Sequence, residues 1–544
     1  MDINTLLVSS RTADVISEQL IGYVELPEDL IIQDQGLKKY RADQMGVQTL
    51  DVTSWDNGAY IGCFDAGEYW HIRTDLTGQE LLYLYESKDG WGASNSLYDL
   101  RNFVRQSGWS LTTDLVGLHS LGTKAWNAQP SIHRTSFKEI KLLRSNQWVK
   151  ILKTTAQMEV FTTPLSAVLR SKPELSCKEL LELGIEDSIN SLYSFSRVSP
   201  NFHLICQLSG GRDSRASFGM LTKIPIENVR FSIQSNKQSR DELVVAEEIA
   251  EAFGYRVNQF SLDKRPYARS EDVYENWKRA SLGTYTPIYA SHFAASNFGI
   301  QIKGDIPISI SDSFYAKTYD SYVKRVKSSL TNRVIRKEME KELGEFKKSL
   351  ILDGFSEDEA KALLYFCFRS RFHSGRRWSR QLNHLGFVHA PIMNKHIVMA
   401  AIKAIEEGLT MDAFKSNILI GLNHRLALFP FSDDDKNISL DDVKASLFPE
   451  SPNFNLRQKR VHVDESELKT QKLVTSKKRV TRIDFIDQLK SDFDSIKVEL
   501  QSCEWFDQSL LERANKELAA KKSLAHNFRA TVFCLHVAFA LNLI

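Results

Sequence analysis

The chain has 544 residues, of which 42% are hydrophobic and 25% are charged, proportions that are typical of folded globular proteins and exclude global disorder. This length predicts two or more domains. Lys and Arg number 70 against 68 Asp and Glu, so the formal charge of +2 excludes general electrostatic attraction to nucleic acid or anionic membrane as the basis of function. Binding partners must therefore be recognised at local sites.

The chain shows no targeting or metal-binding signature. Residues 1–19 contain several charged side chains and no apolar run of signal-peptide length, and the apolar tail from Thr531 to Ile544 is too short to span a bilayer. The six cysteines are dispersed, without a CxxC pair or a histidine at metal-ligand spacing. We expect a cytoplasmic protein without membrane insertion, structural zinc or a disulfide framework.

The first part of the chain, residues 47–168, is predicted to be mostly β. It contains short alternating or aromatic runs separated by turns, such as Tyr60 to Phe64, Tyr69 to Arg73 and Leu81 to Tyr85. After Pro164 the pattern changes, and leucines and isoleucines at helical spacing predict a helix over Cys177 to Ser196. This change places a domain boundary at about residue 168.

Strands and helices alternate in the next segment. The predicted order is a strand from His203 to Leu208, a helix from about Asp213, a strand from Val229 to Ile233, and a helix from Asp241 to Phe253. This alternation predicts a parallel, doubly wound sheet. From about Tyr322 the sequence is largely helical, with amphipathic stretches at Lys395–Glu407 and Ser509–Ala520 and a mixed-charge helix face over Lys324–Lys348.

A Ser-Gly-Gly turn, Leu208-Ser-Gly-Gly-Arg-Asp-Ser-Arg215, lies between the first of these strands and its helix. Adjacent glycines let a ligand approach the main chain, and a helix start offers unpaired amides that favour phosphate. Asp213 would repel a bare phosphate, so a divalent cation that bridges it to a polyphosphate explains its presence, with hydroxyls from Ser209 and Ser214. The turn therefore predicts ATP and Mg²⁺ as ligands, whereas the alternative for an isolated Gly-Gly pair is an ordinary capped turn.

This turn resembles the SGGxDS loop of the ATP pyrophosphatase (PP-loop) superfamily, whose members cleave ATP between its α and β phosphates and form an adenylated intermediate. Further segments, in order, resemble those of the asparagine synthetase-like branch, which includes asparagine synthetases, β-lactam synthetases and lasso peptide cyclases. The segments are Phe231–Asn236 with Asp241–Ala250, Ile308–Asp312, His389–Asn394, Lys415–Ile420 and Arg457–Lys459. Thr135–Leu143 is similar to a segment near the end of the family's glutaminase-like domain.

The resemblance implies a fold and a set of site residues. Residues 1–168 would form a mostly β, glutaminase-like (Ntn-type) αββα domain, and residues 169–544 a doubly wound parallel α/β PP-loop synthetase domain with a helical C-terminal part. Mg²⁺ would bind Asp213 and Asp312, and Lys459 and Arg457 would be catalytic. Lys459 lies in a basic run, Arg457–Arg482, which would either close over the nucleotide as a lid or form a solvated loop. ATP and pyrophosphate would contact Leu208, Ser209, Gly210, Gly211, Arg212, Asp213, Ser214, Ser232 and Ile233.

Two departures from the family shape the functional prediction. Asp2 stands where glutamine-hydrolysing members expose a cysteine, so the first domain is expected to lack glutaminase activity, as in β-lactam synthetases. Ile308 and Ile310 replace the glycines of the segment that ends in the second magnesium-binding aspartate. The aromatic cluster formed by Tyr285, Pro287 and Tyr289 is assigned to core packing rather than to substrate contact.

The predicted protein is an ATP-dependent carbon-nitrogen ligase. It would adenylate a carboxylate, release pyrophosphate and couple the acyl adenylate to an amine, within one molecule or between two, in the synthesis of a specialised metabolite, a modified peptide or a surface polysaccharide. Its partners would be small-molecule or peptide acids and amines, without nucleic acid, and either further copies of the chain or pathway proteins. The alternatives are a catalytically degenerate member that serves as a scaffold and a PP-loop enzyme with another acceptor.

Overall fold

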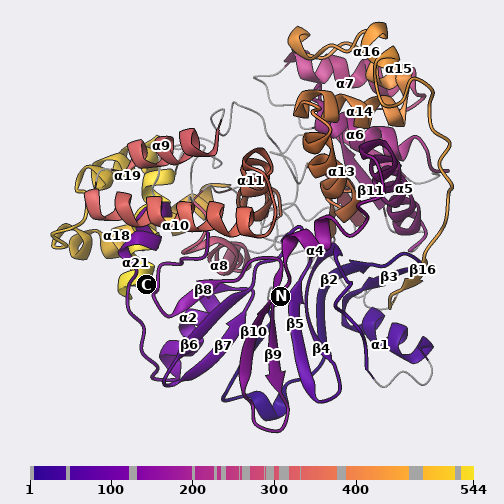
Figure 1. Cartoon of the computed structure of the whole chain (residues 1–544). Helices are drawn as coiled ribbons and strands as arrows, with labels where there is room; N and C mark the ends of the chain where they lie inside the picture. Colours follow the sequence, from indigo (N-terminus) through magenta and orange to yellow (C-terminus); the bar gives the residue numbers. More distant parts are fainter. Residues whose placement is uncertain are drawn as a thin grey trace.

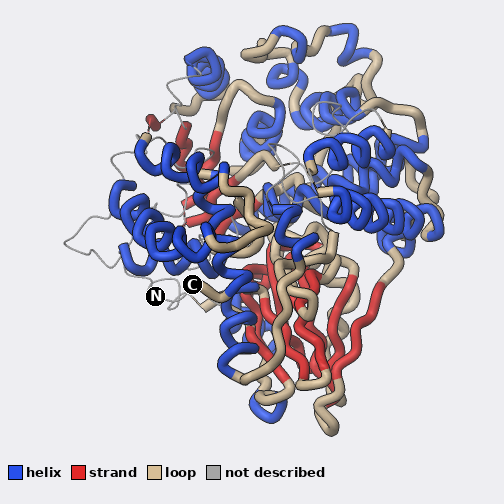
Figure 2. Tube along the Cα trace, turned by 90° about the vertical axis from the view of Figure 1, so that its left-hand side faces the viewer, coloured by secondary structure: helices blue, strands red, loops and turns tan. Residues whose placement is uncertain are grey.

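The structure, a computed structural model, is a mixed α/β protein with several sheets and many helices (Figure 1). The two sheets of the N-terminal part lie at one end of the molecule and most helices at the other (Figure 2). The structure describes residues 5–44, 49–121, 132–198, 203–225, 229–233, 240–256, 258–259, 270–286, 288, 299–305, 318–330, 332–375, 387–464, 482–520 and 528–544.

The N-terminal part is a β-sandwich with helices on both outer faces. A four-stranded sheet in the order β1-β7-β6-β8 packs on a seven-stranded sheet in the order β10-β9-β5-β4-β2-β3-β16. Strand alternation divides the side chains between layers: Leu82 and Leu84 enter the core between the sheets, whereas Tyr83 and Tyr85 pack with residues of helices α2 and α3. Helix α1 covers the other sheet over Val24 and neighbouring residues.

The sandwich confirms the prediction of a mostly β region. Its strands are β1 (Leu7–Ser9), β2 (Gln19–Glu25), β3 (Asp29–Ile32), β4 (Asn57–Asp65), β5 (Tyr69–Thr74), β6 (Tyr83–Ser87), β7 (Gly90–Ser94), β8 (Ile140–Leu142), β9 (Gln147–Leu152), β10 (Met158–Thr162) and β16 (Arg460–His462). Its helices are the 3₁₀ turn η1 (Ala13–Val15), α1 (Gln33–Asp43), α2 (Leu97–Gln106) and α3 (Leu115–Leu121).

A third sheet follows, in which every strand is parallel to its neighbours, as the sequence predicts. Its five strands lie in the order β13-β12-β11-β14-β15. Their bounds are β11 (His203–Gln207), β12 (Val229–Ile233), β13 (Asn258–Gln259), β14 (Gly299–Ile302) and β15 (Phe387–His389). Because the chain first adds strands on one side of β11 and then on the other, the strand order reverses between β11 and β14.

The helices beside this sheet begin and end close to the predicted positions. Helix α5 (Cys177–Ser196) is stabilised by a capping box, in which Ser176 and Glu179 satisfy each other's backbone amides. Gly254, with φ +77°, follows the end of α7. The other helices of this region are α4 (Leu165–Leu169), α6 (Arg212–Leu221), α7 (Arg240–Ala252), α13 (Lys395–Glu406), α14 (Met411–Leu422), α15 (His424–Ala427), the 3₁₀ turn η6 (Asp434–Lys436) and α16 (Leu440–Lys444).

The remaining helices form a second cluster above the sandwich (Figure 1). They are α8 (Ser270–Ser281), α9 (Tyr319–Ser329), α10 (Arg333–Leu352), α11 (Glu357–Leu364), the π-helix η5 (Tyr365–Gly375), α18 (Arg482–Gln501), α19 (Ser509–Ala519) and α21 (Arg529–Leu541). The mixed-charge face predicted over Lys324–Lys348 is divided between α9, which ends at Ser329, and α10, which begins at Arg333 and buries one side. Among the described residues, no helix combines the length and the apolarity that a bilayer span requires.

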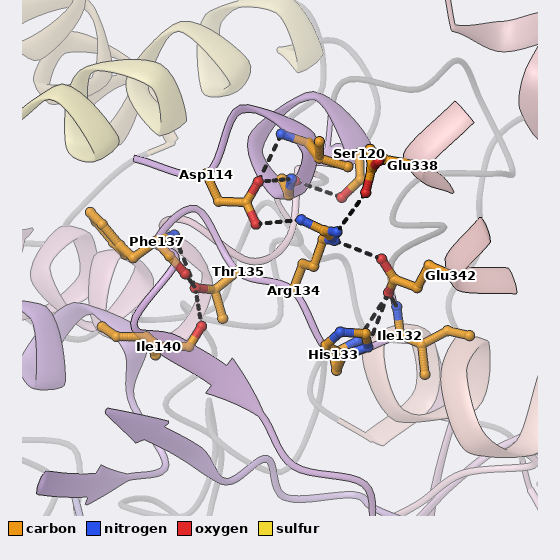
Figure 3. Close-up of polar contacts among 12 residues, drawn as sticks. Asp114, Ser120, Ile132, His133, Arg134, Thr135, Phe137, Ile140, Glu338 and Glu342 are labelled. Carbon is orange, nitrogen blue, oxygen red and sulfur yellow. Dashed lines mark hydrogen bonds and ion pairs between the residues drawn. The ribbon is translucent and has the colours of Figure 1, made fainter. Parts of the chain in front are cut away.

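An ionic network joins the sandwich to α10 (Figure 3). The guanidinium of Arg134 donates to Asp114 at 3.0 Å, to Glu338 at 3.3 Å and to Glu342 at 3.0 Å. Glu342 is buried and also accepts the backbone amide of Ile132 at 2.6 Å. Since this loop leads into the Thr135–Leu143 segment, the network fixes that segment against the helical cluster.

The basic run that begins at Arg457 is only partly described, and its described part is ordered. Residues 460–462 form β16, which adds to the edge of the seven-stranded sheet in parallel with β3. Residues 465–481 lie outside the described residues. Residues 457–459 have no regular structure, with Arg457 and Gln458 exposed and Lys459 buried, and only residues 460–462 are a sheet strand. The lid over Arg457–Arg482 stays a prediction.

Candidate functional site

The Ser-Gly-Gly turn lies at the carboxyl edge of the parallel sheet. It connects β11 to α6, next to the point between β11 and β14 where the strand order reverses. In open α/β sheets ligands bind outside the carboxyl ends of the strands at such a point, because the connecting loops diverge there and leave a crevice. The fold thus places this turn where a ligand site is expected.

Hydroxyl contacts hold the turn in shape while the start of the helix stays open. The Ser209 and Ser214 hydroxyls lie 3.0 Å apart, and Ser214 Oγ also accepts the Ser209 amide at 3.1 Å. Gly211 is the N-cap of α6 and offers no side-chain cap. The first amides of α6 are therefore left without a side-chain acceptor, which is the arrangement that favours an anion.

Two glycines permit close packing around the turn. A side chain at Gly210 would meet the Ser432 hydroxyl at 2.8 Å, so the loop after α15 closes one side of the turn. A side chain at Gly304, just after β14, would overlap the main chain of Asp213 and Ser214. The turn after β14 therefore packs directly against the first residues of α6. Glycine is required at position 304, because a side chain there would overlap this main chain.

Both acidic and basic side chains interact electrostatically with Asp213. Its carboxylate is exposed to water, although surrounding protein atoms and the nearby Asp305 raise its pKa, an effect that Lys415, Arg212 and Lys436 oppose. Two carboxylates beside several cations form a setting that suits a polyphosphate with a divalent cation, because each charge on the ligand meets its opposite. Asp305 and Lys436 are not among the residues predicted from the sequence.

The first turn of α6 is anchored by two arginines. Arg212 donates to Asp412 at 3.1 Å and to the Lys436 carbonyl at 3.2 Å. Arg215 is completely buried, donates to the carbonyls of Phe429 at 2.6 Å and Pro430 at 2.8 Å, and lies 3.7 Å above the Phe431 ring. These contacts tie the loop before η6 to the start of α6 and so fix the wall of the site.

Lys459 occupies a different environment from the turn. Its side chain is 6% exposed, its Nζ lies 3.9 Å from Glu25 Oε2, and its amide donates to Ser194 Oγ at 2.9 Å. In the part of the chain that the structure describes, Lys459 contacts the sandwich and α5 rather than the turn. Arg457 is exposed, and its amide donates to Asn190 at 2.8 Å.

The structure therefore brings together only some of the predicted site residues. Residues 208–214 form one group with Asp305 and Lys415, and Lys459 belongs to a second group with Glu25 and His389. Ser232 and Ile233 lie on β12, whose backbone is parallel to β11. Asp312 and the altered glycines, within residues 306–317, lie outside the described residues, as do Pro287 and Tyr289, whereas Tyr285 is buried as predicted.

The donor set at the turn fits magnesium and not a protein-enclosed metal cage. Across the described ranges, no group of three or more His, Cys, Asp or Glu side chains is arranged to hold a metal ion. Magnesium usually binds through one or two carboxylates together with phosphate oxygens and water. Asp213 with Asp305 supplies hard oxygen donors of this kind beside an anion-binding helix start.

The comparisons with known proteins add little. No family model matches the sequence, and no curated protein is significantly similar to it. One solved structure that matches is glutamine phosphoribosylpyrophosphate amidotransferase from B. subtilis complexed with ADP and GMP, at 9% identity and a TM-score of 0.15, covering 68% of this chain and 80% of that chain. This likeness is too slight to support an assignment of fold or function.

Proposed function

We propose that the chain is an ATP-dependent carbon-nitrogen ligase that adenylates a carboxylate and couples it to an amine. The observation that carries the proposal is the Ser-Gly-Gly turn at the strand-order reversal, followed by a helix start that lacks a side-chain cap. Asp213, Asp305 and Lys415 surround this helix start with the charges that a magnesium-bound triphosphate requires.

In the proposed reaction, the substrate carboxylate attacks the α phosphorus of ATP and pyrophosphate leaves, which gives an acyl adenylate. The amide of Arg212 at the helix start binds the departing pyrophosphate, with Lys415 and Lys436 nearby to offset its charge. Mg²⁺, held by Asp213 with Asp305 or Asp312, would neutralise phosphate charge. The amine then attacks the activated carbonyl and AMP leaves.

Lys459 is proposed to stabilise the negative charge that develops as the amine attacks. Its place beside the end of β15 supports this role, because β15 ends on the same edge of the sheet as β11. The strand order is that of a doubly wound fold, and the helix-covered sandwich is the arrangement expected of an Ntn-type αββα domain. The proposal therefore includes a glutaminase-like domain over residues 1–168 and a PP-loop domain over residues 169–544. It also includes a cytoplasmic location.

A catalytically degenerate scaffold is the second candidate. The observation in its favour is the burial of Lys459 against Glu25, which draws the lysine toward the sandwich. An enzyme and a scaffold differ in turnover, because a scaffold releases no pyrophosphate from ATP.

Pyrophosphate release tests the proposal. Purified protein is supplied with ATP, Mg²⁺ and pools of candidate acids and amines, and the products are identified by mass spectrometry. Asp213→Ala is expected to reduce release by about 100-fold or more, because the nucleotide loses its cation site. Asp441→Ala, which removes a carboxylate that is 91% exposed on α16, is the matched control. Release that is equally fast in Asp213→Ala would refute the assignment of this site.

Lys459→Ala separates the two steps. The variant is expected to bind ATP and to lose amide product, because the turn that binds the phosphates is built without this lysine. Wild-type amide formation in Lys459→Ala would remove the lysine from the proposed chemistry. An adenylated product without an amide would instead favour an enzyme with another acceptor.

A further inference from the structure

The segment that carries Lys459 is held by the N-terminal sandwich. Strand β16 begins immediately after Lys459 and pairs with β3, with Leu30 opposite Val461. His462 adds side-chain contacts, since its Nε2 lies 2.7 Å from Asp29 Oδ1 and its Nδ1 lies 3.3 Å from Asp43 Oδ2. The segment is therefore fixed to the sandwich by main-chain and side-chain bonds together.

The register of this pairing directs Lys459 toward Glu25. Glu25 on β2 is opposite Leu30 on β3, and Leu30 is opposite Val461 on β16, so these three residues share one face of the sheet. Lys459 precedes Val461 by two residues and, at the period of a strand, faces the same side. The result is the observed separation of 3.9 Å between Lys459 Nζ and Glu25 Oε2, with side chains that are 6% and 9% exposed.

The groups around Glu25 leave Lys459 as its charged partner. Burial lowers the pKa of His389 to about 3, with Lys459 adding to the effect, so the imidazole is neutral although its Nδ1 lies 3.5 Å from Glu25. The Tyr23 hydroxyl lies 2.8 Å from the same Nδ1, and Ser191 Oγ lies 3.3 Å from Nε2. Burial raises the pKa of Glu25, and Lys459, followed by a hydrogen bond from Ser191, opposes this rise. Lys459 is thus the cation that faces this buried carboxyl group.

This pair is connected to the Ser-Gly-Gly turn through the sheet. The carbonyl of His389 accepts the amide of Lys303 at 2.9 Å, and the next residue, Gly304, lies against Asp213. Strands β15 and β11 are two neighbours apart in the sheet, which corresponds to about 10 Å.

We infer that Glu25 of the N-terminal sandwich is a positioning residue for Lys459, so that the sandwich completes the site at the carboxyl edge of the parallel sheet. This inference rests on the proposed function for its catalytic consequence. The claim that Glu25 holds Lys459 in place rests on the contacts alone. The sandwich would then be required for ligation.

Chemical labelling tests, without any need for turnover, whether Glu25 holds Lys459 in place. The full-length protein is treated with an amine-acetylating reagent, and the labelling rate of each lysine is measured by peptide mass spectrometry. Lys459 is expected to react more slowly than Lys444, whose side chain is 77% exposed. Glu25→Gln should raise the rate at Lys459 severalfold and leave Lys444 unchanged, whereas Glu28→Gln, an exposed neighbour on the β2–β3 turn, should change neither. Unchanged protection of Lys459 in a folded Glu25→Gln protein would overturn the inference.

Kinetics test the catalytic consequence. Glu25→Gln is expected to lower kcat by about tenfold or more with KM for ATP unchanged, because a misplaced lysine affects the transition state more than nucleotide binding. Glu25→Asp should recover part of the loss, a rescue that a general folding defect would not show. Wild-type kcat in Glu25→Gln together with loss of activity in Lys459→Ala would overturn the inference. Absence of pyrophosphate release from the wild type would instead refute the proposed function, and the labelling result would still decide whether Glu25 fixes Lys459.

Discussion

Replacement of Gly304 by alanine tests the packing of the turn after β14 against the start of α6. A Cβ at this position would overlap the main-chain carbon and oxygen of Asp213 and the amide nitrogen of Ser214. Because the obstacle is backbone and not the end of a flexible side chain, β14 or the start of α6 must move. Overpacking of this kind costs about 1–3 kcal/mol, and we expect the upper part of that range here. The displaced helix start should also bind nucleotide more weakly.

The assay is urea-induced unfolding followed by tryptophan fluorescence, with a nucleotide titration of each folded variant. Gly344→Ala is the matched control, since Gly344 lies on the exposed face of α10 and an added Cβ would meet nothing within 4 Å. This control should gain about 0.5–1 kcal/mol from the higher helix propensity of alanine. Equal free energies of unfolding for Gly304→Ala and the wild type would refute the packing argument.

Three further predictions follow from buried polar groups. Arg215→Met should lower the free energy of unfolding by about 2–3 kcal/mol, because two carbonyls lose their donor, and urea unfolding measures this loss. Burial lowers the pKa of His389 to about 3, so only the unfolded chain gains this proton between pH 6.5 and 3, and His389 should contribute about 2 kcal/mol to the loss of stability from pH 7 to pH 5. His389→Gln should reduce that loss by about 2 kcal/mol and leave the part due to the buried His71 and His536, and an unchanged slope would contradict the assignment. Glu342→Ala should cost about 2–3 kcal/mol, because two backbone amides lose their acceptor and Arg134 loses one of its carboxylate partners. Glu338→Ala, at a side chain that is 41% exposed, should cost no more than about 1 kcal/mol, and urea unfolding compares the two variants.

The parts of the fold that sequence reasoning predicts well are those set by local pattern. The helix over Cys177–Ser196 is found at its predicted bounds because its apolar spacing and its capping box agree. The strand over Val229–Ile233 and its parallel pairing also match, since strand and helix alternation leaves few other topologies.

The missed features depend on contacts between segments far apart in the sequence. The three-residue strand at Arg460–His462 lies inside a basic run and carries too little hydrophobic pattern to be predicted as a strand. The sequence also gives no sign that it pairs with β3, more than 400 residues earlier. Asp305 is not predicted from the sequence, because the family resemblance points to Asp312. The signal that could have found it is Lys303-Gly-Asp305 directly after a buried strand, the same strand-glycine-carboxylate order as in the first turn.

The partnership of Lys459 with Glu25 could not be read from the sequence either. The basic run suggested a lid or a solvated loop, because charge density in a sequence does not show which single side chain is buried. Burial of this lysine follows from strand register, which only the folded chain defines.

Binding of ATP in the presence of Mg²⁺, measured by isothermal titration calorimetry, tests the central claim most directly. The account predicts saturable binding to the wild type, a loss of affinity of about tenfold or more in Asp213→Asn, and unchanged affinity in Asp441→Asn. A folded wild-type protein that does not bind ATP with Mg²⁺, or an Asp213→Asn variant that binds it as tightly as the wild type, would contradict the claim.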